Sequence, residues 1–357
     1  MFAQIHDPTG PTTAPSSLDY YSLLSHLLNM NDTQGENKTT ESLSFTAKSS
    51  LQRMVHELLG KCDVTLDKLS FDQDLYDECK KIMASEYHLP SPRYPWFEKY
   101  LSVGVVIAFT SYAHLPRHHR VQIAVHTSFA TALDDIFSHH HQRMESFNES
   151  FLKGVSQDDL ILDGLAKALL NTSKYYSPIQ SNLIVTSTLD FMTSLIMEVK
   201  IKKMESFDSP SFAAYYRDMS GVSIAFAMFI FPKGIDPATY IQCTPQIGMY
   251  INYMNDVLSF YKEEVAGEEE NLVSMLAKES SITKYEAIQR IADDVAEAEK
   301  DISTRLAGNK LALDGWQSFK RGYVRFHTSS PRYKLDELFE LPYGLTVKET
   351  EGGVEDL

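Results

Sequence analysis

The sequence predicts an all-α protein built as one helical domain. From about residue 48 to residue 340, apolar residues recur at three- and four-residue spacing, whereas alternating strand patterns are scarce. Glycine and proline are few, 16 and 14 in 357 residues, and they fall largely between the periodic stretches. Neither a linker nor a repeat of solenoid period divides this run, so we expect one domain rather than two.

Proline separates the predicted helices and starts two of them. The pairs Ser209–Pro210 and Asp236–Pro237 each combine a good N-cap residue with proline at the first helical position. In chain order, the predicted helices cover about residues 96–113, 119–148, 178–204, 210 onward, 237 onward, 281–304 and 309–328. Stretches that are apolar around most of a helix are typical of the middle of a helical assembly. Three such stretches cover residues 101–112, 181–197 and 221–231.

The two ends of the chain differ from this helical region in composition. Residues 1–47 are rich in turn-forming and polar residues, so we expect them to be largely disordered, with a short amphipathic helix over 20–28. Residues 342–357 form an acidic tail that we expect to be flexible. The folded domain is therefore assigned to residues 48–341.

The composition argues against several classes of protein. A net charge of -15 without a basic stripe is unsuited to general nucleic-acid binding. Cys62, Cys79 and Cys243 show no paired spacing, which favours reduced thiols over disulfides or a zinc site. The first residues lack signal-peptide features, and the longest apolar run, 222–231, is shorter than the roughly 20 residues that span a bilayer. We therefore expect a soluble, cytoplasmic protein without stable membrane insertion.

Asn255, Ser259 and Glu263 form the motif around which a functional site is predicted. They lie at i, i+4 and i+8, so on an α-helix their side chains stack on one face. An amide, a hydroxyl and a carboxylate oxygen on one rigid face suit a hard cation such as Mg2+. Lys262 lies where it can reach an anion held by that cation. Ordinary polar stripes on exposed helices have the same spacing, so the motif alone leaves both interpretations open.

Asp134 and Asp135 are a second candidate for metal binding. These adjacent acids follow a mainly apolar stretch, 129–133. Because neighbouring side chains on a helix point about 100° apart, the two cannot squarely share one face. We expect Asp134 to bind metal and Asp135 to hydrogen-bond a neighbour. The alternative to metal binding is a solvated helix end. Asp135 and His139 also lie at i, i+4, a spacing that can serve a zinc ion, but a solvated helix end is favoured over a zinc site there.

Two arginines are candidates for holding an anion. Arg332–Tyr333 combines a guanidinium with a phenol, and both can donate to one phosphate group. Arg217 precedes an apolar helix, and its alternative role is an ion pair with Asp218 or another acid. Gly221 indicates a helix break or a close backbone approach. Together with the two acidic sites, these residues predict a metal-bridged polyanion, such as a diphosphate, in an otherwise apolar and aromatic cavity.

These motifs resemble those of the class I terpene synthases, and among them the fungal trichodiene synthases. The segment 255–263 is similar to the second metal motif of that family, and 133–135 is similar to its aspartate-rich motif. The segments 216–221 and 322–335 resemble its arginine segment and its C-terminal signature. The resemblance runs over about residues 95–340.

The resemblance implies a role for each matching residue. Asp134 would bind two of three Mg2+ ions. The third ion would be held by Asn255, Ser259 and Glu263. The diphosphate would be bound by Arg217, Lys262, Arg332 and Tyr333, which together with Asp134 form the implied catalytic set. One departure concerns a third acid of the aspartate-rich motif, because this chain has Ser138 at that position.

The same resemblance implies a fold and an activity. The expected fold is a class I terpenoid synthase α-helical bundle around a central apolar cavity. The expected enzyme is a carbon–oxygen lyase, a sesquiterpene synthase that ionises farnesyl diphosphate with Mg2+ and cyclises the carbocation to a hydrocarbon or an alcohol. A homodimer is also implied. Aromatic faces stabilise cations, and the candidates for the cavity wall are Phe129, Trp316, Tyr323 and Phe326.

Two other functions stay open at this point. A prenyltransferase that condenses two isoprenyl diphosphates usually carries two aspartate-rich motifs, and this chain has no second one. A non-catalytic helical module would use an acidic face to bind a partner. Such a module would respond to neither Mg2+ nor diphosphate, whereas the sesquiterpene synthase and the prenyltransferase would respond to both.

Overall fold

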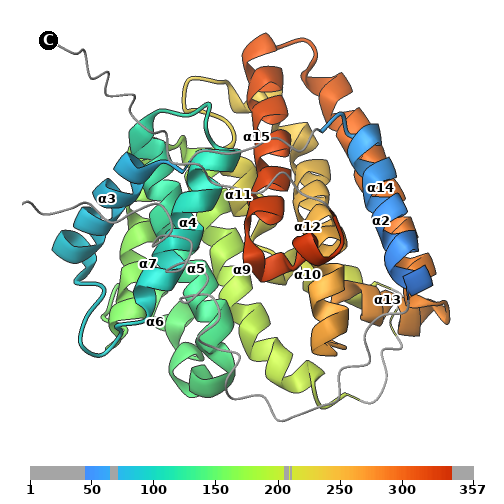
Figure 1. Ribbon diagram of the computed structural model, residues 1–357. Helices are drawn as coiled ribbons and strands as arrows, with labels where there is room; N and C mark the ends of the chain where they lie inside the picture. Colours follow the sequence, from blue (N-terminus) through green and yellow to red (C-terminus); the bar gives the residue numbers. More distant parts are fainter. Residues whose placement is uncertain (1–44, 65–70, 205–208, 210, 340–357) are drawn as a thin grey trace, which may run out of the picture.

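The computed structural model describes residues 45–64, 71–204, 209 and 211–339. Within these ranges every regular element is helical, and the only extended pairing is an isolated bridge between Ser91 and Tyr94 (Figure 1). The all-α prediction is therefore confirmed. The expected helix over 20–28 and the tail over 342–357 lie outside the described residues.

The helices and helical turns follow one another along the chain, with η marking 3-10 turns except η2, which is a π-helical turn. They are α2 Phe45–Lys61, α3 Gln73–Ile82, η2 Met83–Tyr87, α4 Phe97–Ser111, α5 Arg117–Met144, α6 Phe147–Lys153, α7 Leu160–Leu170, α8 Thr172–Tyr175, α9 Pro178–Ile201, α10 Phe212–Ser220, α11 Ser223–Phe229, η3 Pro237–Thr239, η4 Ile241–Cys243, α12 Thr244–Ala266, α13 Leu272–Ser280, α14 Lys284–Leu306, α15 Lys310–Ser329, η5 Pro331–Tyr333 and η6 Leu335–Glu337.

Helix starts and ends were predicted less well than the helices themselves. The expected helix over 119–148 is two helices, because α5 ends at Met144 and α6 begins at Phe147. The expected N-cap at Ser209 is wrong: α10 begins at Phe212, and Ser211 occupies its N-cap position. Local capping preferences therefore identified the right region without selecting the right turn.

The start of α12 also differs from the prediction. Asp236 does act as an N-cap, since its side chain accepts a hydrogen bond from the backbone nitrogen of Ala238 at 3.0 Å. It caps only the short turn η3, and α12 begins later, at Thr244. A second proline, Pro245, lies in the first turn of α12 and provides the favourable start there.

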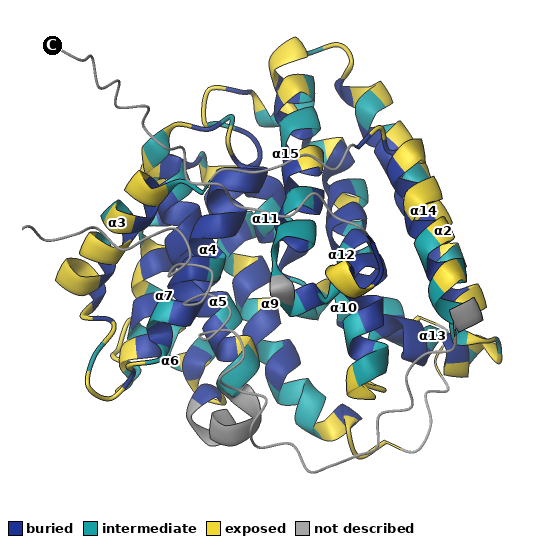
Figure 2. Ribbon diagram, viewed as in Figure 1, coloured by how far each residue is buried: buried dark blue, intermediate teal, exposed yellow. Residues whose placement is uncertain are grey.

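Six helices pack in a closed ring, in the order α4, α5, α9, α11, α12, α15 and back to α4 (Figure 1). Other helices cover this ring from outside: α3 packs on α4, α7 on α5, and α14 on α12, while α2 lies along α14. Buried residues concentrate on the ring helices, and exposed residues on α2, α3 and α14 (Figure 2). The apolar stretches predicted to lie in the middle therefore do so, as parts of α4, α9 and α11.

Gly322 allows α15 to approach α4 closely. A Cβ atom at this position would lie 1.9 Å from the backbone oxygen of Thr110 on α4. Because no side chain fits there, any substitution would push the two helices apart. This contact fixes the part of α15 that precedes the arginine–tyrosine segment.

Lys320 forms a buried ion pair that ties α15 to α14 and to the end of α2. Its Nζ lies 2.7 Å from Glu299 Oε1 and donates to the backbone oxygen of Cys62 at 2.7 Å. We expect Lys320→Met to lower the free energy of unfolding by about 3 kcal/mol, because it leaves a buried carboxylate without its cation. Denaturant unfolding measures this. Lys310→Met removes the exposed pair with Asp314 and should cost below about 1 kcal/mol. Equal losses would contradict the prediction.

The three cysteines and the membrane prediction can also be compared with the structure. Cys62, Cys79 and Cys243 are buried and free, as expected. In the described part of the chain, no helix combines the length and the apolar character needed to cross a membrane.

Candidate active site

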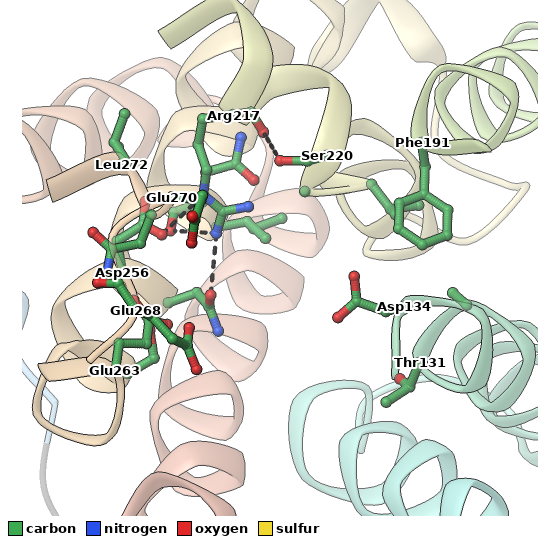
Figure 3. Close-up of a pocket in the computed structure, with 18 of the residues that line it drawn as sticks. Thr131, Asp134, Phe191, Arg217, Ser220, Asp256, Glu263, Glu268, Glu270 and Leu272 are labelled. Atoms are coloured by element: carbon green, nitrogen blue, oxygen red, sulfur yellow. Dashed lines mark hydrogen bonds and ion pairs between the residues drawn. The ribbon is translucent and has the colours of Figure 1, made fainter. Parts of the chain in front are cut away.

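A cavity of about 600 Å3 opens among the ring helices (Figure 3). Its wall includes every residue that the sequence placed in the metal or diphosphate site: Asp134, Arg217, Asn255, Ser259, Lys262, Glu263, Arg332 and Tyr333. These residues come from α5, α10, α12 and η5, which are far apart in the sequence. The fold therefore brings the separate motifs to one place.

The Asn255, Ser259 and Glu263 motif lies on one face of α12, as its spacing predicts. Ser259 and Glu263 are buried, and Asn255 is half-buried. The Ser259 hydroxyl makes no well-aligned hydrogen bond in the structure. Burial raises the pKa of Glu263, although Lys262 and Ser259 oppose the rise. A buried hydroxyl without a well-aligned partner next to a destabilised carboxylate is an arrangement that a cation would stabilise.

Asp134 faces this motif from the opposite side of the cavity. It projects from α5 toward the acids of α12 (Figure 3). The Asp134 side chain is open to the cavity, but the protein around the cavity displaces part of the water that would solvate its carboxylate. This desolvation, together with the charge of Asp135, raises the pKa of Asp134 to about 6. Asp134 and the α12 motif thus present oxygen atoms from two sides of one space.

Asp135, the neighbour of Asp134, is not on the cavity wall and pairs with Arg332. The guanidinium donates to both carboxylate oxygens, from Nη1 at 3.2 Å and from Nη2 at 3.0 Å. Lys99 Nζ lies 3.7 Å from the same carboxylate. Burial would raise the pKa of Asp135, but the charge and hydrogen bonds of Arg332 outweigh it and hold the pKa below its ordinary value. Asp135 therefore hydrogen-bonds a neighbour, as expected, whereas metal binding by Asp134 stays a prediction.

Tyr333 and Lys262 provide further donors on the cavity wall. Tyr333 is buried, and this burial raises the pKa of its phenol to about 12, so the group stays a neutral donor at physiological pH. Lys262 Nζ lies 3.8 Å from Glu263 and 3.8 Å from Glu268. Its ammonium group therefore lies among acids at the polar end of the cavity.

Arg217 is paired with Asp256 rather than with its sequence neighbour Asp218. Its Nε donates to both oxygens of Asp256, at 2.9 and 3.0 Å. Its Nη2 donates to the backbone oxygen of Asn252 and to Oδ1 of Asn255, each at 3.1 Å. Asp218 instead accepts from Asn252 Nδ2 at 3.2 Å. The acid in the middle of the α12 motif is thus the ion-pair partner of Arg217.

Gly221 and Val222 lie between α10 and α11, where Gly221 allows a close approach to α12 and Val222 breaks the helix. A Cβ atom at Gly221 would lie 1.8 Å from Oδ1 of Asn252 on α12. The next residue, Val222, has a φ of 51°, which interrupts the helix before α11 starts. The predicted break and close approach are both confirmed, so the expected apolar run over 221–231 is helical only in part.

Two of the four aromatic candidates lie elsewhere. Tyr323 and Phe326 are on the cavity wall, but Phe129 and Trp316 are not. Phe129 is completely buried against Phe97 and fills the space over Gly164. Trp316 is completely buried as well and packs on Tyr250 and Phe319. Helical periodicity marks such side chains as buried without distinguishing core from cavity.

Several residues of the wall carried no motif in the sequence. Phe191 and Glu198 lie on one face of α9, at i and i+7. Lys202 follows at the C-cap of that helix, and Phe226 joins them from α11. Glu198 and Lys202 form an ion pair with each other. If Phe191 had been known to face a cavity, the helical spacing alone would have placed Glu198 on the same side of the helix.

Carboxylates outnumber basic groups on the cavity wall. The acids are Asp134, Glu198, Asp256, Glu263, Glu268 and Glu270, and the bases are Lys202, Arg217, Lys262 and Arg332. A polyanion alone would be repelled by this wall, whereas an anion that arrives with divalent cations would be attracted. Over the described ranges, no group of three His, Cys, Asp or Glu side chains is by itself arranged to hold a metal ion.

Comparison with known proteins identifies the family of this chain. The sequence model of the family described as trichodiene synthase (TRI5) matches residues 97–349. The chain belongs to the trichodiene synthase family. Alpha-cuprenene synthase COP6 of Coprinopsis cinerea is 33% identical over 301 residues, which cover 84% of this chain and 93% of that protein. Monoterpene synthase 25 of Postia placenta is 29% identical over 294 residues, 80% of this chain and 86% of that protein.

Solved structures support the fold of this trichodiene synthase family member. The linalool/nerolidol synthase from Streptomyces clavuligerus, in complex with 2-fluorogeranyl diphosphate, matches with a TM-score of 0.60 and 15% identity. The match covers 76% of this chain and 98% of that chain. The expected class I terpenoid synthase bundle is thereby confirmed, and the relatives place the chain among the terpene synthases.

Proposed function

We propose that the protein is a sesquiterpene synthase that ionises farnesyl diphosphate with Mg2+, releases diphosphate and cyclises the resulting carbocation. The observation that carries this proposal is the two-sided arrangement of one cavity. Asp134 faces the Asn255, Ser259 and Glu263 motif across the space, and the same wall carries arginine and lysine donors as well as apolar and aromatic side chains. We assign this activity to the domain over residues 48–341.

The donor set on the wall fits Mg2+. Its side chains offer carboxylate, amide and hydroxyl oxygens, and none of the described wall residues is a histidine or a cysteine. Asp134 would hold two ions, and Asn255, Ser259 and Glu263 would hold a third. When bound, Mg2+ supplies Lewis-acid stabilisation of the charge that develops on the leaving diphosphate.

The remaining residues of the site bind the substrate and keep water out. Arg332 and Tyr333 donate to the diphosphate from one side, and Lys262 and Arg217 donate from α12 and α10. Tyr323, Phe326, Phe191 and other apolar residues of the wall fold the prenyl chain and exclude water, which would otherwise quench a carbocation. The aromatic faces among them stabilise positive charge through their quadrupoles.

Incubation with C10, C15 and C20 prenyl diphosphates tests this function, with products identified by gas chromatography and mass spectrometry. We expect a cyclic C15 hydrocarbon or alcohol that forms with Mg2+ and disappears when a chelator removes the metal. Because one relative is named a monoterpene synthase, the C10 substrate is the closest competitor in chain length. A cyclic C10 product alone would overturn the assignment to farnesyl diphosphate.

A second incubation, with isopentenyl diphosphate added, distinguishes the prenyltransferase. A longer prenyl diphosphate formed only with this co-substrate would replace the cyclase proposal. Absence of any product, together with no thermal shift on addition of Mg2+ and diphosphate, would instead favour a non-catalytic module.

A further inference from the structure

His327, near the end of α15, connects two helices behind the cavity wall. Its imidazole is completely buried and does not line the cavity. Nδ1 lies 2.7 Å from the backbone oxygen of Tyr323, and Nε2 lies 3.0 Å from Nδ2 of Asn255. On the other side of the same amide, Oδ1 of Asn255 accepts from Arg217 Nη2 at 3.1 Å. Asn255 and Arg217 are both on the cavity wall.

The chemistry of these partners fixes the direction of each hydrogen bond. A backbone oxygen only accepts, so Nδ1 of His327 carries the ring proton and donates it to Tyr323. The neutral ring then has an unprotonated Nε2, which accepts from the Asn255 amide nitrogen. With its nitrogen held by the ring, the amide turns its oxygen to the opposite side, toward Arg217. One protonation pattern therefore satisfies the whole chain of contacts.

We propose that His327 is a positioning residue that keeps the Asn255 oxygen directed toward the cation site. This inference rests on the proposed function, in which that oxygen binds Mg2+. An amide can rotate by 180° and exchange its oxygen for its nitrogen, and only the oxygen can bind a metal ion. Rotation would place the Asn255 oxygen against the lone pair of the ring and its NH2 group against the Arg217 donor.

Arg217 and a bound cation would share one atom of the amide. Nη2 of Arg217 donates to Oδ1 of Asn255, which is the atom that a cation would need, and two positive groups at one oxygen repel each other. The His327 contact uses the amide nitrogen instead, so it is compatible with a cation on Oδ1. His327 is thus the partner that still orients Asn255 when Oδ1 is taken by the metal.

Three substitutions at position 327 separate orientation from packing. In His327→Gln, the end of the side chain reaches the place of Nε2 and offers an acceptor to Asn255. In His327→Asn, the shorter side chain reaches only the place of Nδ1 and loses the contact with Asn255. His327→Phe keeps the ring, which packs 4.5 Å from the Tyr333 ring and 4.7 Å from the Tyr323 ring between centroids, but it has no acceptor.

The measurement is the affinity for inorganic diphosphate in the presence of Mg2+, by titration calorimetry on the full chain. We expect His327→Asn and His327→Phe to lower this affinity by about 10- to 100-fold and His327→Gln to restore most of it. The control is His126→Asn, at a completely buried histidine whose Nε2 lies 3.0 Å from Thr188 Oγ1. It removes a buried imidazole away from Asn255 and should leave the affinity unchanged.

The outcomes distinguish this inference from the proposed function. If the parent protein does not bind diphosphate with Mg2+, the proposed function itself is wrong. If the parent binds and His327→Phe binds equally well, His327 has no positioning role. A purely structural role would lower the melting temperature of the three variants without the recovery of affinity in His327→Gln. If His327→Asn does not fold, the comparison of His327→Phe with His327→Gln decides.

Discussion

Glu263→Gln is expected to lower turnover by at least about 100-fold while the protein stays folded. Glu263 contributes the carboxylate of the proposed α12 cation site, and it is buried beside Ser259 and Lys262. A Lewis-acid contribution of several kcal/mol depends on holding that cation, and each 1.36 kcal/mol corresponds to about tenfold in rate. Asn255→Ala should act in the same direction. Product formation at saturating farnesyl diphosphate and Mg2+ measures both effects.

Glu264→Gln is the matched control for this prediction. Glu264 is the next residue on α12, lies outside the cavity wall and pairs with Lys284. Glu264→Gln removes one negative charge from the same helix turn as Glu263→Gln does, so a long-range effect of charge on turnover would appear in both variants. Turnover should stay close to that of the parent protein. If Glu263→Gln and Asn255→Ala both keep full Mg2+-dependent product formation, the metal assignment on α12 is wrong.

Arg332→Ala is expected to weaken binding of diphosphate with Mg2+ by about 10- to 150-fold. Hydrogen bonds to charged groups contribute about 1.5–3 kcal/mol, and removing this guanidinium leaves the Asp135 carboxylate without its bidentate partner. Asp135 is the neighbour of Asp134, so the negative charge that Arg332 no longer balances also changes the electrostatic potential at the proposed metal site of Asp134. Premature quenching of the carbocation should increase, seen as a larger share of acyclic alcohols.

Two variants sharpen the interpretation of Arg332. Arg332→Lys keeps the charge but lacks the planar fork, so it should recover only part of the affinity. Arg321→Ala removes an exposed arginine of α15 that lies outside the cavity wall and should have no effect on binding. If the affinity of Arg332→Ala equals that of the parent protein, Arg332 does not belong to the site.

The motif on α12 could be predicted because its information is local. Spacing alone places Asn255, Ser259 and Glu263 on one helix face, and the structure has them there. The separation of Asp134 from Asp135 follows from the same geometry. Such statements need only the rise and turn of one helix, so no knowledge of neighbouring helices is required.

Other features depend on which helices meet. Asp256 lies within the α12 motif, and only the packing of α12 against α10 makes it a buried partner of Arg217. Phe129 and Trp316 look like Tyr323 and Phe326 in sequence, yet only the latter pair lines the cavity. His327 stood within the recognised C-terminal segment, but its contact with Asn255 joins two helices.

The sequence by itself determined the all-α class, the approximate helices and the residues that carry oxygen and guanidinium groups. These follow from periodicity and residue type, which are properties of single segments. Only the tertiary structure decided that these groups share one cavity, which aromatic side chains border it and which acid each arginine pairs with. The physical reason is that burial and ion pairing arise between helices that are distant in sequence, where each side chain competes for partners that its own segment does not encode.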